Sequence, residues 1–273
     1  NHGGTEMGQG LFIKVAQVVA DVFQIEMDAI KITATATGKV PNTSATAAST
    51  GSDLNGMAAF NAGMQIRGRM VKVAADHFGV GDEIITFREG RVHANNESVS
   101  FGELAKMSWL KRVQLSEAGF YKTPKIHWDG KTMRGRPFFY FSYGAAVAEV
   151  AIDTLTGETR CLRADIVQDI GTPLNPAIDL GQIEGAFVQG MGWLTCEELW
   201  WDKEGRLRTV GPSTYKIPGS RDVPPVFNVS LLDQMPNKEE TVFRSKAIGE
   251  PPLMLAIAVW LAIPDSSASI GGN

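Results

Sequence analysis

A glycine, a glutamate and two prolines stand in a row at residues 249–252, and together they constrain the backbone around them. Proline lacks an N–H group and fixes its own φ, so it interrupts a strand and suits the first turn of a helix. The apolar segment 253–263 follows, which predicts a helix that begins just after Glu250. A carboxylate there commonly compensates the helix dipole, for about 0.3–1 kcal/mol. The alternative interpretation is a general base held on rigid backbone.

Composition narrows the class of protein. The chain has 273 residues, enough for one large domain or two smaller ones. Its 44% hydrophobic and 21% charged residues are typical of a soluble globular protein. The net charge of −4 creates no bulk positive field, so we expect neither nucleic acid nor an anionic membrane as a partner. Cys161 and Cys196 are the two cysteines, and their spacing argues against a disulfide framework, a zinc site or an iron–sulfur cluster within this chain.

Two features of the sequence bear on the cellular compartment and on whether the chain belongs to a longer protein. The apolar run 253–263 is too short to span a bilayer, and no secretory signal is visible, so we expect a cytoplasmic protein. A glycine-rich loop begins at the first residues, and no strand precedes it to brace it. We therefore expect the chain to be a piece of a longer protein.

The glycine-rich loop at residues 3–10 runs directly into an amphipathic segment at 11–22, which predicts a helix. Unpaired N–H groups at a helix start attract anions. The loop lacks the lysine of a P-loop and the spacing of a dinucleotide fingerprint, so neither ATP nor NAD is indicated. A plain tight turn explains the glycines equally well. Gln9 adds an amide that can both donate to and accept from a heterocycle.

A second loop, at residues 40–52, is rich in serine, threonine and alanine. The alternating segment 30–36 before it predicts a strand, and the segment 53–78 after it predicts a long helix. A flexible linker has this loop composition too. Because a linker rarely opens straight into a long helix, we expect a close-fitting loop whose hydroxyls line a polar ligand, with Ala47 and Ala48 letting it approach the backbone.

The remaining pattern predicts an α+β fold of mixed sheets and helices. We expect a hairpin at 83–95, helices at 101–112 and 175–190, and extended segments at 138–152, 158–170, 194–201, 209–215 and 226–232.

A soft boundary near residue 130 divides the chain into lobes 1–130 and 131–273, and whether the two are related α/β halves stays open. Glycines 181, 185 and 190 weaken the second helix by about 1 kcal/mol each, which favours close contact with a backbone or a ligand. No histidine–carboxylate set has metal-ligand spacing, so we expect no metal ligand from the protein.

Four segments in this order, 3–10, 40–49, 181–190 and 246–252, closely resemble the second molybdenum-cofactor domain of the xanthine dehydrogenase and oxidase family. Residues 211–218 resemble it too, and the similarity covers nearly the whole chain. One such motif is weak evidence, but the ordered set is specific. Two motifs, Pro-Asn-Thr-Ser at residues 41–44 and Gly-Glu-Pro-Pro-Leu at residues 249–253, are most similar to those of xanthine dehydrogenases. An aldehyde oxidase is the alternative.

The resemblance implies a molybdopterin cofactor that is held by hydrogen bonds, with no protein atom on the metal. It assigns pterin or phosphate contacts to Gln9, Thr46, Ser49 and Gln182, backbone access to Gly8 and Gly10, and positions facing the metal and purine to Ala47 and Ala48. Glu250 matches the family's catalytic glutamate. In that family the glutamate takes a proton from the Mo–OH group, whose oxygen attacks an electron-poor ring carbon while hydride passes to the Mo=S sulfur.

The resemblance also implies parts outside these residues: an upstream molybdenum half with a substrate-orienting arginine, and iron–sulfur and FAD domains or subunits in an oligomeric enzyme that acts on xanthine or hypoxanthine. By itself the chain is therefore expected to be inactive, and whether it retains any cofactor stays open. Two alternatives stay open from the residues alone. One is a noncatalytic anion- or nucleotide-binding module, which the two loops before helices would suit; the other is a purely structural domain.

Overall fold

The computed structural model describes residues 1–40, 43–47, 49–232 and 235–270. The chain forms two compact units, and each has its own hydrophobic core. The first unit contains Asn1–Phe139 and the short segment Glu239–Phe243; the second contains Tyr140–Lys238 and Arg244–Asn273. The boundary predicted from the sequence lies near residue 130, and no sequence signal indicated the returning segment.

The first unit is built on three helices, α1 (Leu11–Phe23), α2 (Gly51–Phe78) and α3 (Phe101–Leu110), with the short 3₁₀ turns η1 (Met27–Ala29) and η2 (Asp82–Ile84). Local chemistry sets their ends. Helix α2 stops at Gly79, which adopts the left-handed conformation (φ 68°) that glycine takes without strain. Helix α3 starts at a capping box, in which Ser100 and Glu103 satisfy each other's backbone N–H groups. All three helices confirm the sequence predictions within a few residues.

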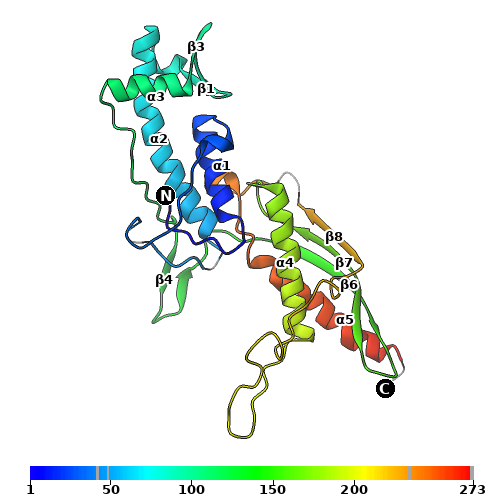
Figure 1. The fold of residues 1–273 in the computed structure, drawn as a ribbon. Coiled ribbons are helices and arrows are strands. Elements are labelled where there is room, and N and C mark those ends of the chain that lie inside the picture. The colour runs from blue at the N-terminus through cyan, green and yellow to red at the C-terminus, as the bar shows by residue number, and fades with distance from the viewer. Residues whose placement is uncertain (41–42, 48, 233–234, 271–273) are drawn as a thin grey trace. The chain divides into compact units, whose positions relative to one another are not determined.

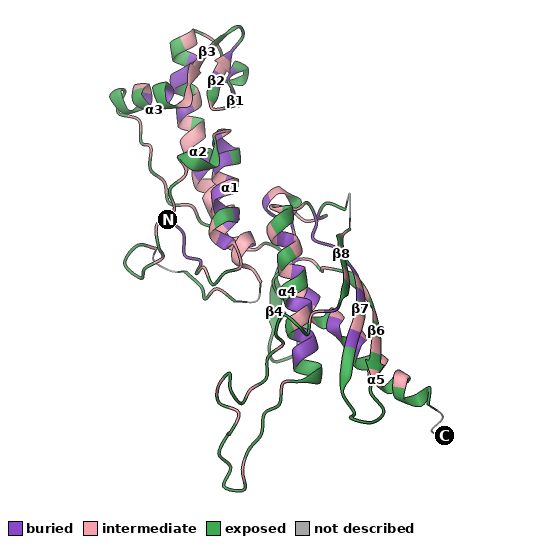
Figure 2. Ribbon diagram, turned by 45° about the vertical axis from the view of Figure 1, so that its right-hand side comes forward, coloured by how far each residue is buried: buried purple, intermediate pink, exposed green. Residues whose placement is uncertain are grey.

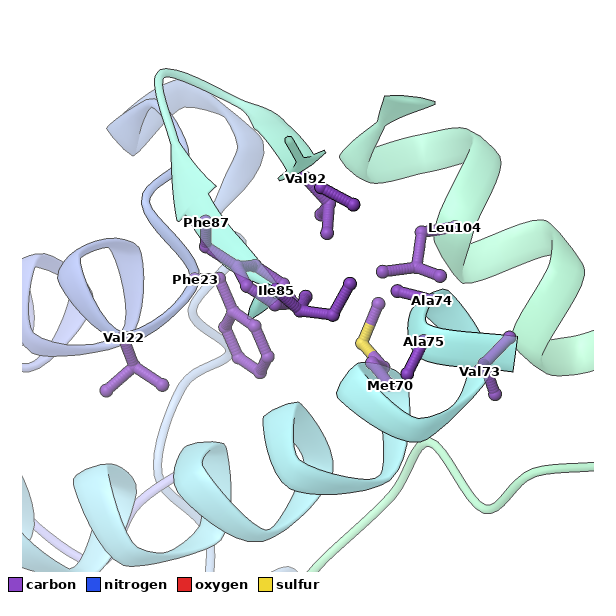
Figure 3. Close-up of a cluster of buried hydrophobic side chains, with 11 residues drawn as sticks. Val22, Phe23, Met70, Val73, Ala74, Ala75, Ile85, Phe87, Val92 and Leu104 are labelled. Carbon is purple, nitrogen blue, oxygen red and sulfur yellow. The ribbon is translucent and has the colours of Figure 1, made fainter. Parts of the chain in front are cut away.

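A small antiparallel sheet closes the core of the first unit. Its strands are β1 (Thr86–Arg88), β2 (Arg91–Ala94) and β3 (Glu97–Ser100), and the predicted hairpin turns at Glu89 and Gly90, both with positive φ. Figure 3 shows the buried side chains that join this sheet to the helices, among them Phe23, Met70 and Leu104. A second hairpin pairs β4 (His127–Asp129) with β5 (Arg134–Arg136).

The returning segment belongs to this core as well. Val242 is buried, and a Cβ at Gly56 of α2 would lie 3.3 Å from its side chain. Glu239 accepts from Lys125 and from Arg136, each at 2.6 Å. The returning segment 239–243 is thus tied to the first unit by two ion pairs and by apolar contacts, which include the edge-on packing of Phe243 against Phe60 at a centroid distance of 5.9 Å.

The second unit is a three-stranded sheet covered on one face by helices. Strand β6 (Gly144–Ile152) runs antiparallel to β7 (Thr159–Gln168), and β8 (Val226–Leu231) runs parallel to β7. The helices are α4 (Pro176–Thr195), the 3₁₀ segment η4 (Pro251–Ala256) and α5 (Ile257–Ala268); the turn η3 (Val242–Arg244) stands at the return point of the chain. Figure 2 shows buried positions along α4 and β7, where Ile183 and Phe187 join the core with Ala164 and Ile166.

Four predicted extended segments were wrong or too long, and the one predicted from residue 138 becomes a strand only at Gly144. Residues 30–36, all of which are described, form no strand: a strand needs a partner, and here the Thr35 hydroxyl instead donates to the carbonyl of Gly4 at 2.6 Å. Helix α4 continues to Thr195, so the segment predicted as extended from residue 194 begins inside a helix. Residues 209–215 form no strand: a turn occupies residues 211–215, where the Gly211 carbonyl accepts from the backbone N–H of Tyr215 at 2.7 Å.

Within the described residues, one helical stretch, Pro251–Ala268, has the length (18 residues) and mean hydropathy (1.3) of a candidate membrane span. The apolar run 253–263 forms only the centre of this stretch. A mostly buried core helix of a soluble protein meets the same criteria; here 17% of the stretch is buried, and the buried residues include Ala256 and Val259 in the core of the second unit. The finding is weak evidence for a membrane.

The glycines of α4 differ in their surroundings. A Cβ on Gly190 would lie 2.3 Å from the carbonyl oxygen of Leu253, so α4 and η4 approach closely at this point, as the glycine pattern predicted. A Cβ on Gly181 or Gly185 would meet nothing within 4 Å. Close helix packing therefore explains one of the three glycines and leaves the other two on an open face.

Replacement of Gly190 with alanine should destabilise the protein by about 1–3 kcal/mol, because the backbone carbonyl of Leu253 cannot move aside as a side chain could. The matched control is Gly185→Ala on the same helix, which should stabilise it by up to about 1 kcal/mol through helix propensity alone. Thermal or denaturant unfolding of both variants measures the difference. Equal effects would contradict the close contact.

Candidate functional site

The glycine-rich loop folds around the carboxylate of Glu6. One carboxylate oxygen accepts from the backbone N–H groups of Gly8 (2.9 Å) and Gly10 (3.0 Å), and the other accepts from Phe12 (2.9 Å) in the first turn of α1. These N–H groups include ones that a helix start leaves without partners. The anion position predicted at this helix is therefore filled by the chain's own carboxylate, which sequence analysis missed.

The surroundings lower the pKa of Glu6. Its partial burial acts to raise the pKa, but the N–H donors of Phe12, Gly8 and Gly10 together outweigh that effect, and the pKa lies below the ordinary value of 4.5. Glu6 is thus a stable internal anion at neutral pH, and it sets the shape of the loop.

Gln9 and its two flanking glycines complete the loop. The Gln9 amide donates to the carbonyl of Thr5 (2.8 Å) and accepts from the N–H of Met7 (2.6 Å). Gly8 (φ 102°) and Gly10 (φ 76°) adopt left-handed conformations that other residues rarely tolerate. Gly8 and Gly10 therefore allow the turn, and the Gln9 amide secures it while keeping one donor and one acceptor position unused.

The hydroxyl-rich loop lies against the glycine-rich loop. The Thr46 hydroxyl accepts from the backbone N–H of Thr5 at 2.8 Å. A Cβ on Gly3 would lie 1.8 Å from the Thr43 hydroxyl oxygen, so only glycine fits there. Ala47 is exposed, whereas Ala48 lies outside the described residues. The first unit thus brings together the loops that carry Gln9 and Thr46, which are far apart in the sequence.

Among the predicted site residues, Ser49 has the environment that most clearly indicates a ligand. Its hydroxyl oxygen is buried and has no hydrogen-bond partner among the described residues, and its backbone is left-handed (φ 55°). A buried polar group without a partner costs about 1–3 kcal/mol, so such groups are rare unless something binds them. A hydrogen-bonding ligand at the start of α2 would satisfy this hydroxyl.

His2 is a second buried group with an unused polar atom, and no sequence signal marked it. Its Nδ1 accepts from the N–H of Gly4 at 3.1 Å, while Nε2 has no partner in the described part of the chain. Burial is the main reason that the pKa of His2 lies below 6.5. The ring packs edge-on against Phe12 at a centroid distance of 4.8 Å, so His2 also supports the glycine-rich loop.

Glu250 lies in the second unit, at the start of η4 as predicted. Its backbone carbonyl accepts from the N–H of Leu253 (3.0 Å), and Pro251 and Pro252 form the first positions of the helix. Its side chain is exposed and makes no capping hydrogen bond. No capping hydrogen bond therefore holds this carboxylate, and both interpretations from the sequence, compensation of the helix dipole and a general base, remain predictions.

The backbone just before Glu250 is firmly attached. The N–H of Lys246 donates to the carbonyl of Ile170 (2.8 Å), and the N–H of Thr172 donates to the carbonyl of Arg244 (2.9 Å). Gly171 allows this approach: its φ is 64°, and a Cβ there would lie 2.3 Å from the Arg244 carbonyl. The segment 244–248 thus pairs with the residues that follow β7, and the backbone that leads to Glu250 is fixed there.

Gln182 is half-buried on α4, in the second turn of that helix. The start of α4 is well defined, because the Asn175 side chain accepts from the N–H of Ile178 at 3.1 Å and Pro176 follows the cap. The open glycines 181 and 185 lie on either side of Gln182 in the sequence. Neither glycine has an atom within 4 Å of a built Cβ, so the helix surface at these two positions is unobstructed.

The predicted site residues are divided between the two units. Gly8, Gln9, Gly10, Thr46, Ala47 and Ser49 belong to the first unit, and Gln182 and Glu250 to the second. Within the part of the chain that is described, no group of three or more histidine, cysteine, aspartate or glutamate side chains could hold a metal ion. What these residues offer a ligand is hydrogen-bonding groups, glycine-shaped turns and one exposed carboxylate.

Comparison with known proteins identifies the class. Residues 1–224 match the molybdopterin cofactor-binding domain family, and the chain belongs to that family. The buried, unpartnered Ser49 hydroxyl and the unused positions of the Gln9 amide fit a cofactor that is held by hydrogen bonds.

Individual relatives give a narrower comparison than the family does. The chain is 48% identical over 273 residues to a xanthine dehydrogenase/oxidase of Felis catus, covering 100% of this chain and 19% of the relative. It is 48% identical over 265 residues to a xanthine dehydrogenase of Dictyostelium discoideum, covering 96% of this chain and 18% of that relative. The chain therefore spans about a fifth of the length of these relatives.

Solved structures confirm the predicted fold class. The quinoline 2-oxidoreductase of Pseudomonas putida 86 superposes with a TM-score of 0.82 at 25% identity, covering 98% of this chain and 33% of that one. A Cu,Mo-CO dehydrogenase superposes with a TM-score of 0.81 at 21% identity and the same coverage, which supports the fold alone.

Replacement of Glu6 with glutamine should destabilise the protein by about 1 kcal/mol at neutral pH, since a neutral amide accepts from N–H groups more weakly than a partly exposed carboxylate does. Because the folded-state pKa is lowered, the stabilisation is fully present above pH 4.5 and is lost as the pH falls through the folded-state pKa. Unfolding measured across this range tests it, with Glu26→Gln, at an exposed site in the same unit, as the control. An equal pH dependence of the two variants would contradict the assignment.

Proposed function

We propose that this chain is the catalytic-half domain of a molybdenum hydroxylase that oxidises a purine, xanthine or hypoxanthine, as part of a longer polypeptide. The observation that carries the proposal is the exposed Glu250 carboxylate, which makes no capping contact and follows a segment fixed to the end of β7. The similarity to xanthine dehydrogenases over the whole chain supports the purine substrate over an aldehyde.

Glu250 acts as the general base. A positioned carboxylate contributes typically about 10²–10⁴-fold to rate by proton transfer. When bound, the molybdenum cofactor supplies the two-electron oxidation of the purine ring carbon. The carboxylate oxygens of Glu250 take up the proton that is released as that carbon gains its oxygen. Exposure of this side chain leaves both oxygens available for the task.

The remaining site residues hold the cofactor. Ser49, Thr46, Gln9 and Gln182 supply hydrogen bonds to the pterin or its phosphate, Gly8 and Gly10 shape the loop, and Ala47 and Ala48 leave space beside the metal and the purine. The Thr46 hydroxyl accepts from Thr5 and keeps its proton for a ligand. An iron–sulfur part, a flavin part and the other half of the molybdenum site are assigned to the rest of an oligomeric enzyme.

A simple anion-binding module is the rival function, and Glu6 argues against it. The N–H groups that such a module would offer at the start of α1 are taken by this carboxylate. Metal and pterin analysis of the complete protein separates the two functions, because an anion-binding module would carry neither molybdenum nor pterin.

In the complete enzyme, Glu250→Gln should lower kcat for xanthine by about 10²–10⁴-fold, because the amide cannot accept the proton. Molybdenum and pterin contents should stay at the wild-type level. Steady-state kinetics per bound molybdenum, with xanthine and with an aldehyde as substrates, measure the effect and the preference.

The control for this variant is Glu204→Gln, at an exposed position of the same unit, which should leave kcat unchanged. Near-wild-type turnover of Glu250→Gln would reject the base assignment. A preference for the aldehyde would reject the purine substrate while leaving the role of Glu250 intact.

Ser49→Ala should reduce cofactor retention by about tenfold or less, the loss expected for one hydrogen bond. The cofactor-free protein should be no less stable than the wild type, because the change removes a buried hydroxyl without a partner. Pterin fluorescence after dialysis, together with thermal unfolding, gives both readouts, and the exposed Ser44→Ala is the control. Full retention of the pterin would remove Ser49 from the site.

A further inference from the structure

Lys246 is four residues before Glu250, and its amine is buried. Its side chain is 10% exposed and forms an ion pair with Asp169, whose side chain is 3% exposed. The amine also donates to the carbonyl of Phe141 (3.0 Å) and lies 5.5 Å from the centre of the Tyr143 ring. The proton-transfer role assigned to Glu250 does not use this pair.

Asp169 is held from several directions just after the end of β7. Its second carboxylate oxygen accepts from the N–H of Gly171 at 3.0 Å. Its backbone carbonyl accepts from the Ser142 hydroxyl (2.6 Å), and its N–H donates to the carbonyl of Tyr143 (2.7 Å). The carboxylate that receives Lys246 is therefore itself fixed.

The segment around Lys246 is joined to the same strand end by its backbone. The N–H of Lys246 donates to Ile170, and the N–H of Ala247 donates to the Tyr140 hydroxyl at 2.7 Å. Ile248 is buried in the core of the second unit. From Lys246 to Ile248 each residue thus has an anchor, and Glu250 follows two residues later with no capping contact of its own.

A buried ion pair adds little net stability, because desolvation offsets most of the attraction, but it can select one register of an extended segment. A shift by one residue turns every side chain of such a segment to the opposite face. Lys246 could not shift without leaving the Asp169 carboxylate buried and unpaired. Displacing the segment would therefore cost more free energy than the intact pair contributes to the stability of the protein.

We propose that Lys246 and Asp169 are positioning residues for Glu250: their buried ion pair fixes the register of segment 244–250 against residues 168–172, and so fixes where the carboxylate lies. This inference rests on the proposed function of Glu250 as the base. A displacement of about 1 Å at a reacting group can lower a rate by about 10²-fold.

The test uses the complete enzyme with Lys246→Met, the double variant Lys246→Met with Asp169→Asn, and Lys203→Met as an exposed control from the same unit. The double variant removes both charges, so it leaves no uncompensated buried charge if the single variant fails to fold. We expect kcat per bound molybdenum to fall by roughly 10–100-fold in the Lys246 variants, with KM changed by less than about twofold and normal cofactor content.

A second readout does not depend on activity. Hydrogen exchange at the amides of Lys246 and Ala247 should become roughly tenfold faster in the double variant, because the segment is no longer held in one register. The control should match the wild type in both measurements.

Three results would overturn the proposal: wild-type kcat per molybdenum in the double variant, activity that falls only in proportion to cofactor content, or unchanged exchange at the two amides. Glu250→Gln separates this inference from the proposed function. If that variant is inactive while the double variant is normal, the positioning role alone fails. If Glu250→Gln is fully active, the assigned base fails, and with it the reason for positioning.

Discussion

The pairing of segment 244–246 with residues 170–172 is the constraint on which the second unit's candidate site depends. The chain leaves the second unit for Glu239–Phe243 and returns at Arg244, where two backbone hydrogen bonds attach it to the end of β7. Gly171 makes the approach possible, since a side chain there would collide with the Arg244 carbonyl. These two hydrogen bonds therefore set the position of the backbone from Lys246 to the start of η4.

Two carboxylates near helix starts are used in opposite ways. Glu6 is turned inward, and its contacts with three backbone N–H groups shape a loop. Glu250 makes no capping contact and is exposed. The proline pair at the start of η4 contributes to this difference, because prolines have no N–H groups that could hold the Glu250 side chain against the helix. A carboxylate without such internal partners is available for chemistry, whereas one with three is part of the scaffold.

Periodicity predicted the elements that depend on local pattern. The apolar spacing after the glycine-rich loop, the long run that became α2, and the alternating β7 and β8 were all confirmed. The wrong predictions fell where alternation occurred without a partner strand, at residues 30–36, where a helix continued past its predicted end, at residues 194–195, or where a turn followed a glycine, at residues 209–215. Alternation describes a surface that could pair, and only the tertiary structure shows whether a neighbour exists.

By itself the sequence determined the α+β class, the ordered motifs that mark the molybdopterin cofactor-binding domain, and the position of Glu250 at a helix start, because each of these depends on residues close together in the chain. Only the tertiary structure decided that Glu6 fills the anion position of α1, that the Ser49 hydroxyl is buried without a described partner, and that Lys246 meets Asp169. These features arise from how folding places side chains against backbone and against residues as many as 77 positions away, a juxtaposition that no local pattern encodes.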